Sequence, residues 1–239
     1  MTLAPGDGAR AAISTDASRS IDGATATGSF APGRTMSTMR VVPLTPELWP
    51  AFSEWFGSRD TSTDCRWCWC LFWRQRGMDF SNTTAQGNRD GLRELTERAA
   101  TSGPAPGLVA IDEDGKMVGW VSLGPRTDFE RLERSRTIPR LDDRPVWSVV
   151  CFVVGRRARG RGVARELLDA AIDYARTNGA PTLEAYPADP GDARLPATAA
   201  YTGMLPMFEA AGFTKVADTT SRTGGAPRVV VRRELDVER

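Results

Sequence analysis

The 239-residue sequence contains no histidine. Without imidazole, the Ser-His-Asp and Cys-His forms of nucleophilic catalysis are excluded, and the most common metal ligand of proteins is absent. Any acid–base chemistry in this chain must therefore use Asp, Glu, Tyr, Cys, Lys or bound water.

Three further absences narrow the class of protein. No run of 18 apolar residues occurs, so we expect no membrane span. The net charge is only +1, so the overall charge does not indicate binding to nucleic acid or to an anionic membrane. The first residues lack the charged start and apolar core of a secretory signal, and the four cysteines do not suggest a disulfide framework. We therefore expect a reduced, cytoplasmic, soluble protein.

The chain divides by composition into two parts. Residues 1–38 are rich in Ala, Gly, Ser, Thr and Asp and show no apolar periodicity. Such a segment cannot bury enough apolar surface to offset the entropy of ordering, so we predict a flexible tail. Residues 39–239 carry the periodic apolar patterns of one folded domain.

Regular patterns in the folded part predict alternating strands and helices. Strands are expected at 39–42, 66–74, 108–111, 117–123, 146–154, 182–186, 213–217 and 228–235. Helices are expected at 45–56, with Thr45 as N-cap and Pro46 after it, and at 84–100, 163–176 and 199–211. The strand at 66–74 depends on the alternation of its tryptophans, and 125–145 is expected to be a loop or short helix. This order predicts an α/β fold in which a mixed central sheet is flanked by helices.

The segment 146–176 carries most of the functional information. An apolar strand leads into the loop 155–162, which contains four arginines and three glycines, and an amphipathic helix follows. A helix N-terminus offers unpaired N–H groups and a partial positive charge, and Gly160 and Gly162 let the backbone approach a ligand. This combination predicts a pyrophosphate site.

Two common phosphate-binding fingerprints do not fit this loop. A Walker A loop matches at Gly155 and Gly160, but Arg161 replaces its lysine and Gly162 its hydroxyl residue. The dinucleotide fingerprint matches at Gly160 and Gly162, but Arg165 stands at its third position. For the loop alone, an ordinary arginine-rich turn before a helix is the alternative.

The pattern R-x-x-G-x-G does fit, at Arg157, Gly160 and Gly162. Here the sequence resembles the GNAT (Gcn5-related) N-acetyltransferase superfamily, and residues 204–213, which end in Gly-Phe, resemble that superfamily's later helix. The resemblance covers about residues 39–239. It implies a GNAT fold and transfer of an acetyl group from acetyl-CoA to an amine of a small molecule or protein, directly in a ternary complex, with a homodimer possible. The alternative is a non-catalytic acyl-CoA-binding or regulatory domain.

The resemblance also assigns residues to the binding of acetyl-CoA. Backbone groups near Val153 and Val154 are expected to pair with the pantetheine arm and polarise the thioester carbonyl. The complete expected set is Val153, Val154, Arg157, Ala158, Arg159, Gly160, Arg161, Gly162, Val163 and Ala164.

The catalytic residues are less clear from the sequence. Phe208 stands where many relatives have a tyrosine that protonates the departing thiolate, so Tyr201 or Tyr186 is a substitute acid, or solvent supplies the proton. Tyr201 has the alternative of a core residue at a helix start. Glu184 is the candidate base for the acceptor amine, with a solvent-facing position or a structural ion pair as its alternatives.

Two clusters suggest other functions more weakly. Cys65, Cys68 and Cys70 have part of a zinc spacing, but the fourth cysteine, Cys151, lies within a buried strand, and no histidine is available. In a strand, Cys68 and Cys70 would lie about 7 Å apart on one face, too far for a disulfide. We therefore expect no metal, and the tryptophans are expected to form core or an acceptor-pocket wall. The loop arginines suit the phosphates of CoA better than nucleic acid.

Overall fold

A computed structural model of the chain describes residues 39–196 and 198–236. The strands are β1 (Arg40–Pro43), β2 (Gly107–Ile111), β3 (Met117–Pro125), β4 (Trp147–Val154), β5 (Thr182–Ala185), β6 (Thr214–Thr223) and β7 (Ala226–Glu234). The α-helices are α1 (Trp49–Gly57), α2 (Thr63–Cys68), α3 (Gly77–Ser81), α4 (Ala85–Ala99), α5 (Glu130–Glu133), α6 (Val163–Thr177) and α7 (Leu205–Ala210), and two 3-10 helices are η1 (Arg126–Asp128) and η2 (Arg156–Ala158).

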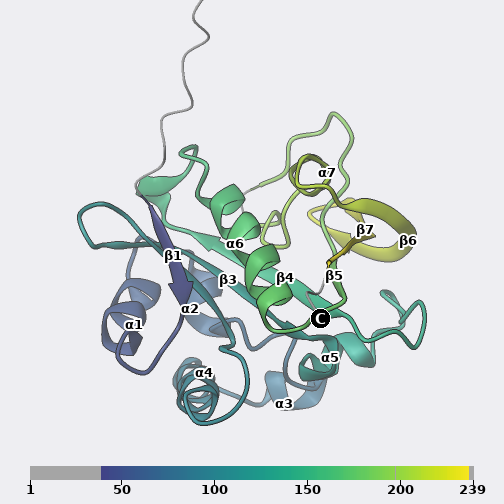
Figure 1. The fold of residues 1–239 in the computed structure, drawn as a ribbon. Coiled ribbons are helices and arrows are strands. Elements are labelled where there is room, and N and C mark those ends of the chain that lie inside the picture. The colour runs from purple at the N-terminus through teal and green to yellow at the C-terminus, as the bar shows by residue number, and fades with distance from the viewer. Residues whose placement is uncertain (1–38, 197, 237–239) are drawn as a thin grey trace, which may run out of the picture. The chain divides into compact units, whose positions relative to one another are not determined.

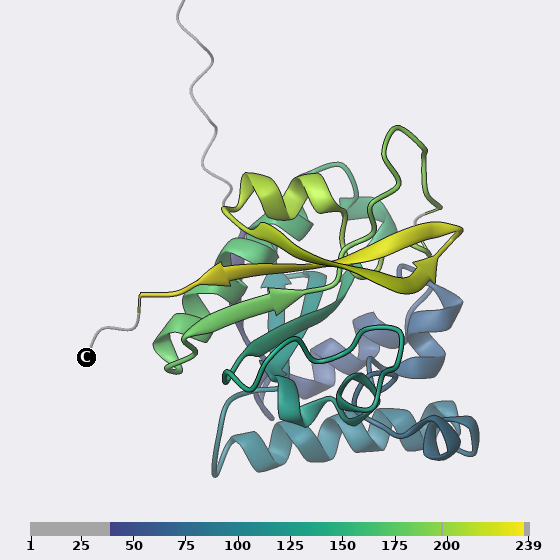
Figure 2. The same cartoon turned by 90° about the vertical axis from the view of Figure 1, so that its right-hand side faces the viewer.

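The strands form one mixed sheet with helices on both faces, as predicted. Its order is β1-β2-β3-β4-β5-β7-β6, and neighbours are antiparallel except for β4 and β5. Helices α6 and α7 cover one face, and α1, α2, α4 and α5 lie on the other (Figures 1 and 2). Each face buries its own hydrophobic core, so the sheet is apolar on both sides.

Helix α6 lies on the sheet as its sequence pattern predicts. Its residues Val163, Leu167, Leu168, Ala171, Ile172 and Ala175 are all buried. Gly119 of β3 lies directly below, where an added Cβ would come within 2.6 Å of Val163. Because glycine has no side chain, the start of α6 sits close to the sheet, and this places the loop before α6 at the end of β4.

Strands β4 and β5 pair over only part of their length. Their register joins Trp147–Val149 to Leu183–Ala185, and no pairing with β5 continues beyond Val149. Further along, the Phe152 amide donates instead to the Tyr201 carbonyl at 2.6 Å. The parallel pair therefore separates at the centre of the sheet, and the segment before α7 enters the space between the strands.

The predicted strand at 66–74 is wrong. Ser62 caps α2 by accepting from the Cys65 amide, and the helix ends in a turn where Trp69 and Cys70 adopt positive φ angles of 45° and 53°. Trp69 is buried against Phe56, with ring centroids 5.0 Å apart. Burial of alternate aromatic residues therefore results from tertiary packing around a helix and turn, not from a pleated strand.

Two helix boundaries also differ from the predictions. Helix α1 begins at Trp49 with Leu48 as N-cap, so Thr45 and Pro46 precede it in a turn. The helix expected at 199–211 is confined to Leu205–Ala210, because Gly203 has a φ of +82° just before it. The hairpin of β2 and β3, helices α4 and α6, and strands β4 and β5 agree with the predictions. The predicted tail, residues 1–38, lies outside the described residues, which begin at residue 39. No helix in the described segments is long and apolar enough to cross a membrane.

Candidate functional site

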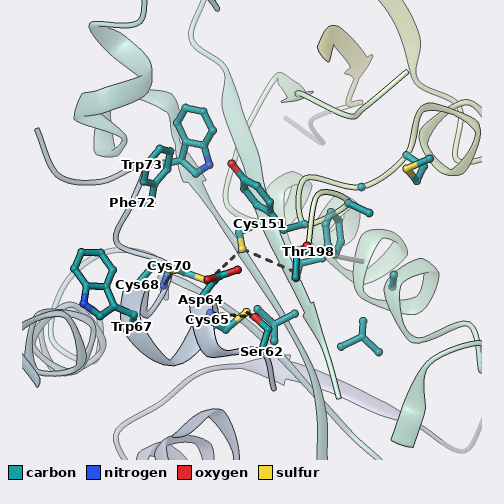
Figure 3. A pocket seen from close by; sticks show the side chains of 18 of the residues that line it. Ser62, Asp64, Cys65, Trp67, Cys68, Cys70, Phe72, Trp73, Cys151 and Thr198 are labelled. Carbon is teal, nitrogen blue, oxygen red and sulfur yellow. Dashed lines mark hydrogen bonds between the residues drawn. The ribbon is translucent and has the colours of Figure 1, made fainter. Parts of the chain in front are cut away.

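A cavity of about 630 Å³ opens beside the free part of β4 (Figure 3). Three parts of the chain line it: the α2–α3 region, the end of β4 with the start of α6, and the segment 198–207 that precedes and begins α7. The separation of β4 from β5 thus brings the segment 198–207 to the same cavity as the α2–α3 region, more than 110 residues away in the sequence.

One end of the cavity adjoins the predicted pyrophosphate loop. Gly160 and Gly162 have φ angles of +75° and +81°, with open space where a Cβ would be. Gly162 is the N-cap of α6, and no side chain caps the helix. Within the described segments, the N–H groups of Arg159 and Arg161 have no hydrogen-bond acceptor. These free donors and the helix dipole suit an anion bound against the backbone.

Asp60 positions the start of this loop, a role that the sequence did not reveal. Its carbonyl accepts from the Arg156 amide at 2.9 Å, and its carboxylate accepts from the Arg157 amide at 3.3 Å and from the Trp55 indole at 3.2 Å. Gly155 allows this approach, because a Cβ there would lie 2.1 Å from the Asp60 carboxylate. The loop is thereby joined to the segment after α1.

The edge of β4 supplies backbone groups to the cavity. Successive amides in a strand point to opposite sides, and Gly155 donates to Val118 of β3 at 2.9 Å. Phe152 donates to the opposite side, toward Tyr201, so the Val154 amide also points away from β3. Val154 therefore presents its N–H, which has no acceptor among the described residues, toward the space that the cavity occupies.

The ten predicted CoA residues fall into three groups. Val153, Val154, Arg159 and Ala164 line the cavity. Arg157, Gly160, Arg161 and Gly162 are exposed in the loop, where their backbone and guanidinium groups are available to a ligand. The side chains of Ala158 and Val163 are buried in the core under α6, which leaves only their backbone to face a ligand.

Tyr201 lines the cavity beside β4. Its hydroxyl accepts a hydrogen bond from Arg228 Nη2 at 2.8 Å, and no described residue accepts its own proton. Burial raises the pKa of Tyr201 to about 12, although the nearby Arg228 charge acts in the opposite direction. Arg228 is buried and forms no ion pair with any carboxylate in the described segments. This end of the cavity therefore combines a protonated hydroxyl with an uncompensated positive charge.

Glu184 occupies a different environment from the one expected of a catalytic base. Its side chain is fully buried and pairs with Arg126 at 2.6 Å and with Arg232 at 2.7 Å. Tyr186 also donates to it at 2.6 Å, and burial raises the pKa of this tyrosine well above its usual range. Neither Glu184 nor Tyr186 is among the residues that line the cavity. The geometry thus favours the structural ion-pair alternative for Glu184.

Phe208 is fully buried in the core under α7. Its ring packs edge-on against Phe213, with centroids 5.2 Å apart, and against Phe152 at 6.2 Å. It does not line the cavity. The position to which the resemblance assigns a proton-donating tyrosine is therefore a packing position here.

The other half of the cavity is aromatic and rich in sulfur. We call its four rings, Trp67, Phe72, Trp73 and Phe80, the aromatic wall. All four cysteines also line the cavity, and Figure 3 shows the thiols of the α2 region facing Cys151. Cys70 Sγ lies 3.3 Å from Cys151 Sγ.

The thiols are in their neutral form. The hydrogen bond with Cys70 and burial raise the pKa of Cys68 well above its ordinary value, and the bond with Cys151 does the same for Cys70. Burial raises the pKa of Cys65. Metal-bound cysteine requires the thiolate, and no group of His, Cys, Asp or Glu side chains within residues 39–196 and 198–236 is arranged to hold a metal ion.

Asp64 was also missed in the sequence. It lies in the first turn of α2 and lines the same cavity as the aromatic wall (Figure 3). The motif Ser62-Thr63-Asp64 is a recognisable helix start. It would have placed this carboxylate correctly if the alternating tryptophans had not favoured a strand.

Comparison with known proteins agrees with this geometry. The sequence profile of the acetyltransferase (GNAT) family matches residues 47–203, which include the cavity-lining parts of α2 and β4 and the loop. The chain belongs to the GNAT acetyltransferase family. It is accordingly an acyltransferase, and acetyl-CoA is the acyl donor of this family. None of the curated proteins compared with it matches in sequence.

Solved GNAT structures share the fold at low sequence identity. The structure titled "histone acetyltransferase HPA2 and related acetyltransferase" from Corynebacterium glutamicum is 19% identical, with a TM-score of 0.50 over 85% of this chain and 99% of the other. A GNAT-family acetyltransferase from Bordetella pertussis is 18% identical, with a TM-score of 0.50 over 84% and 97%. The yncA protein from Salmonella typhimurium, solved with acetyl-CoA, is 18% identical, with a TM-score of 0.48 over 84% and 96%.

Proposed function

We propose that the protein transfers the acetyl group of acetyl-CoA directly to an amine while both substrates are bound. One observation carries the proposal: the cavity that begins at the pyrophosphate loop continues without a break along β4 to the aromatic wall. A donor held at the loop and an acceptor held at the wall therefore meet beside Val154 and Tyr201. No covalent enzyme intermediate is needed for such a transfer.

The loop and the edge of β4 bind and orient the donor. Free N–H groups at the start of α6 and the side chains of Arg157, Arg159 and Arg161 suit the pyrophosphate. The Val154 amide donates toward the pantetheine arm or the thioester carbonyl, where a hydrogen bond polarises the carbon that is attacked.

The transfer breaks one bond and forms another. Acetyl-CoA supplies the acetyl group and a thiolate leaving group. As the C–N bond forms and the C–S bond breaks, the ammonium form of the acceptor loses two protons in total, one to the thiol product and one to solvent.

Tyr201 stabilises the leaving group in this proposal. Its pKa of about 12 lies well above that of an ordinary thiol, about 8.5. Tyr201 therefore donates a hydrogen bond to the developing thiolate and keeps its proton, and solvent completes the protonation. Arg228 behind the hydroxyl favours the negative charge. We assign Glu184 to the stability of the fold instead of to proton transfer.

Two measurements test the proposal and separate it from a non-catalytic acyl-CoA-binding domain. Isothermal titration must detect acetyl-CoA binding, and its absence at tens of micromolar protein would contradict both functions. Release of free thiol in the presence of a panel of amines must then exceed the rate of hydrolysis. Binding without amine-dependent release would favour the non-catalytic domain.

A further inference from the structure

The aromatic wall is a rigid surface. The Trp67 and Phe80 rings meet edge to face with centroids 4.8 Å apart, and Phe72 contacts Phe80 at 5.3 Å and Trp73 at 5.0 Å in the same manner. Arg131 fixes the wall by stacking on Phe72 at 4.1 Å and donating to its carbonyl at 2.7 Å. Interlocked rings of this kind present flat apolar faces to a ligand at little entropic cost.

The charges along the cavity are few and separated. Among the described lining residues, Asp64 is the only acidic side chain and Arg159 the only basic one. Arg159 belongs to the CoA loop, whereas Asp64 lies with the aromatic wall in the α2–α3 region. The Asp64 carboxylate forms no hydrogen bond or ion pair with any described residue, so it is available to a ligand.

We propose that the acceptor is a cationic amine carried on an aromatic or similarly flat apolar group that bears no carboxylate. Asp64 binds the ammonium, and the aromatic wall contacts the apolar body. This inference depends on the proposed function, since it identifies the acceptor class for the same cavity.

Two physical effects select this class. An ammonium is attracted both by a carboxylate and by the negative face of an aromatic ring, so Asp64 and Trp67, three residues apart on α2, act in the same direction. Arginines already lie over the other three rings of the aromatic wall, which therefore contribute apolar contact. A carboxylate on the acceptor would meet Asp64 and four neutral thiols, because the described lining residues of the α2–α3 region include no basic side chain. Arg131 and Arg228 contact rings of the aromatic wall but do not line the cavity. A purely aliphatic amine would keep the charge but leave the rings without a matching surface.

Equilibrium binding tests the inference without requiring turnover. Three probes are titrated into the full chain saturated with CoA: 2-phenylethylamine, L-phenylalanine, which adds a carboxylate, and butylamine, which lacks the ring. We expect 2-phenylethylamine to bind about tenfold more tightly than either of the others, because only this probe satisfies both Asp64 and the rings. Equal or tighter binding of butylamine or L-phenylalanine overturns the inference.

Substitutions locate the binding site. Asp64→Asn is expected to weaken 2-phenylethylamine binding about fivefold, the scale of a partly solvated ion pair, and to leave CoA affinity unchanged. Trp67→Ala, at a partly exposed ring, should weaken it by about the same factor through lost cation–π and apolar contact. Glu54→Gln, an exposed carboxylate on α1 outside the cavity, is the matched control and should change nothing. Unchanged binding by Asp64→Asn overturns the role of Asp64.

Thiol release distinguishes this inference from the proposed function. Release with butylamine but not with 2-phenylethylamine leaves acetyl transfer to amines intact and overturns the acceptor class. If 2-phenylethylamine binds with the expected dependence on Asp64 and no amine releases thiol, the ligand class is supported and the transfer reaction is overturned.

Discussion

Replacing Tyr201 with phenylalanine removes one hydroxyl from the cavity and keeps the ring. In the proposed reaction, this hydroxyl donates to the developing thiolate, while Arg228 donates to it from behind at 2.8 Å. A hydrogen bond to a charged group contributes about 1.5–3 kcal/mol. Because about 1.4 kcal/mol corresponds to a factor of ten in rate, we expect kcat to fall by about 10- to 150-fold. The KM for acetyl-CoA should stay close to the original value.

The same substitution also affects stability. Arg228 loses an acceptor in a buried position where its Nε already lacks a partner, and one unsatisfied buried donor costs about 1–3 kcal/mol. A lower Tm is therefore expected, and a fall in kcat alone could reflect partial unfolding. Assays are best performed well below the Tm of the variant, with the folded fraction measured by circular dichroism.

Tyr174→Phe provides the matched control. Tyr174 lies on α6 and does not line the cavity, and its hydroxyl accepts a hydrogen bond from the Ala105 amide at 2.7 Å. Its loss should lower stability by a similar amount and leave kcat unchanged. Steady-state thiol release measures both variants. A kcat for Tyr201→Phe within about threefold of the original, with the protein folded, would refute the role of the hydroxyl, because that factor is below the energy of one such hydrogen bond.

Three further predictions test the other parts of the site. Gly162→Val should weaken acetyl-CoA binding in isothermal titration by at least about tenfold, because a β-branched residue resists a φ of +81°. The control is Gly179→Val, at a φ of +76° beyond the other end of α6, which should leave the binding unchanged. Equal losses of affinity in the two variants would indicate a general folding defect. Glu184→Gln should destabilise the protein by about 3–5 kcal/mol in urea unfolding, because it leaves the buried charges of Arg126 and Arg232 without this carboxylate. The pH profile of kcat should stay unchanged. Normal stability with a lower kcat would contradict the structural role of Glu184. Since the pKa of Cys70 is raised, its reactive thiolate is scarce at pH 8. The rate of its alkylation by iodoacetamide, followed by mass spectrometry, should therefore still increase above pH 9, and bound CoA should slow it. Rapid labelling of Cys70 at pH 7 would contradict the raised pKa.

Local patterns in the sequence were sufficient for the mixed sheet, the helix α6 and the positive φ angles of the glycines in the loop before it. Each depends on neighbouring residues: the 3.6-residue period of α6, the apolar run of β4, and the glycines that permit positive φ at 160 and 162. The same kind of reasoning was wrong at 66–74. There Trp69 is buried by packing against α1 while Trp67 is partly exposed, and the chain forms a helix and a turn.

Which carboxylate is paired and which lines the cavity could be known only from the folded chain. Glu184 stands in a strand pattern and Asp64 at a helix start, but the neighbouring residues do not show which of the two carboxylates is paired. In the structure, Glu184 lies between Arg126 and Arg232, residues 58 and 48 positions away, whereas Asp64 lines the cavity and has no partner among the described residues. Whether a carboxylate is paired depends on residues distant in sequence, which local periodicity does not encode.

The residues of 146–176 indicated an anion site, because a phosphate cradle is built from consecutive backbone groups and leaves a pattern of glycines and arginines. The resemblance carried by this segment and by 204–213 then implied acetyl-CoA as the donor. The acceptor side has no such pattern. Its surface is assembled from the α2–α3 region, β4 and the segment before α7, which meet because β4 and β5 separate after Val149. Tyr201, Asp64 and the aromatic wall became a single site only through that long-range packing.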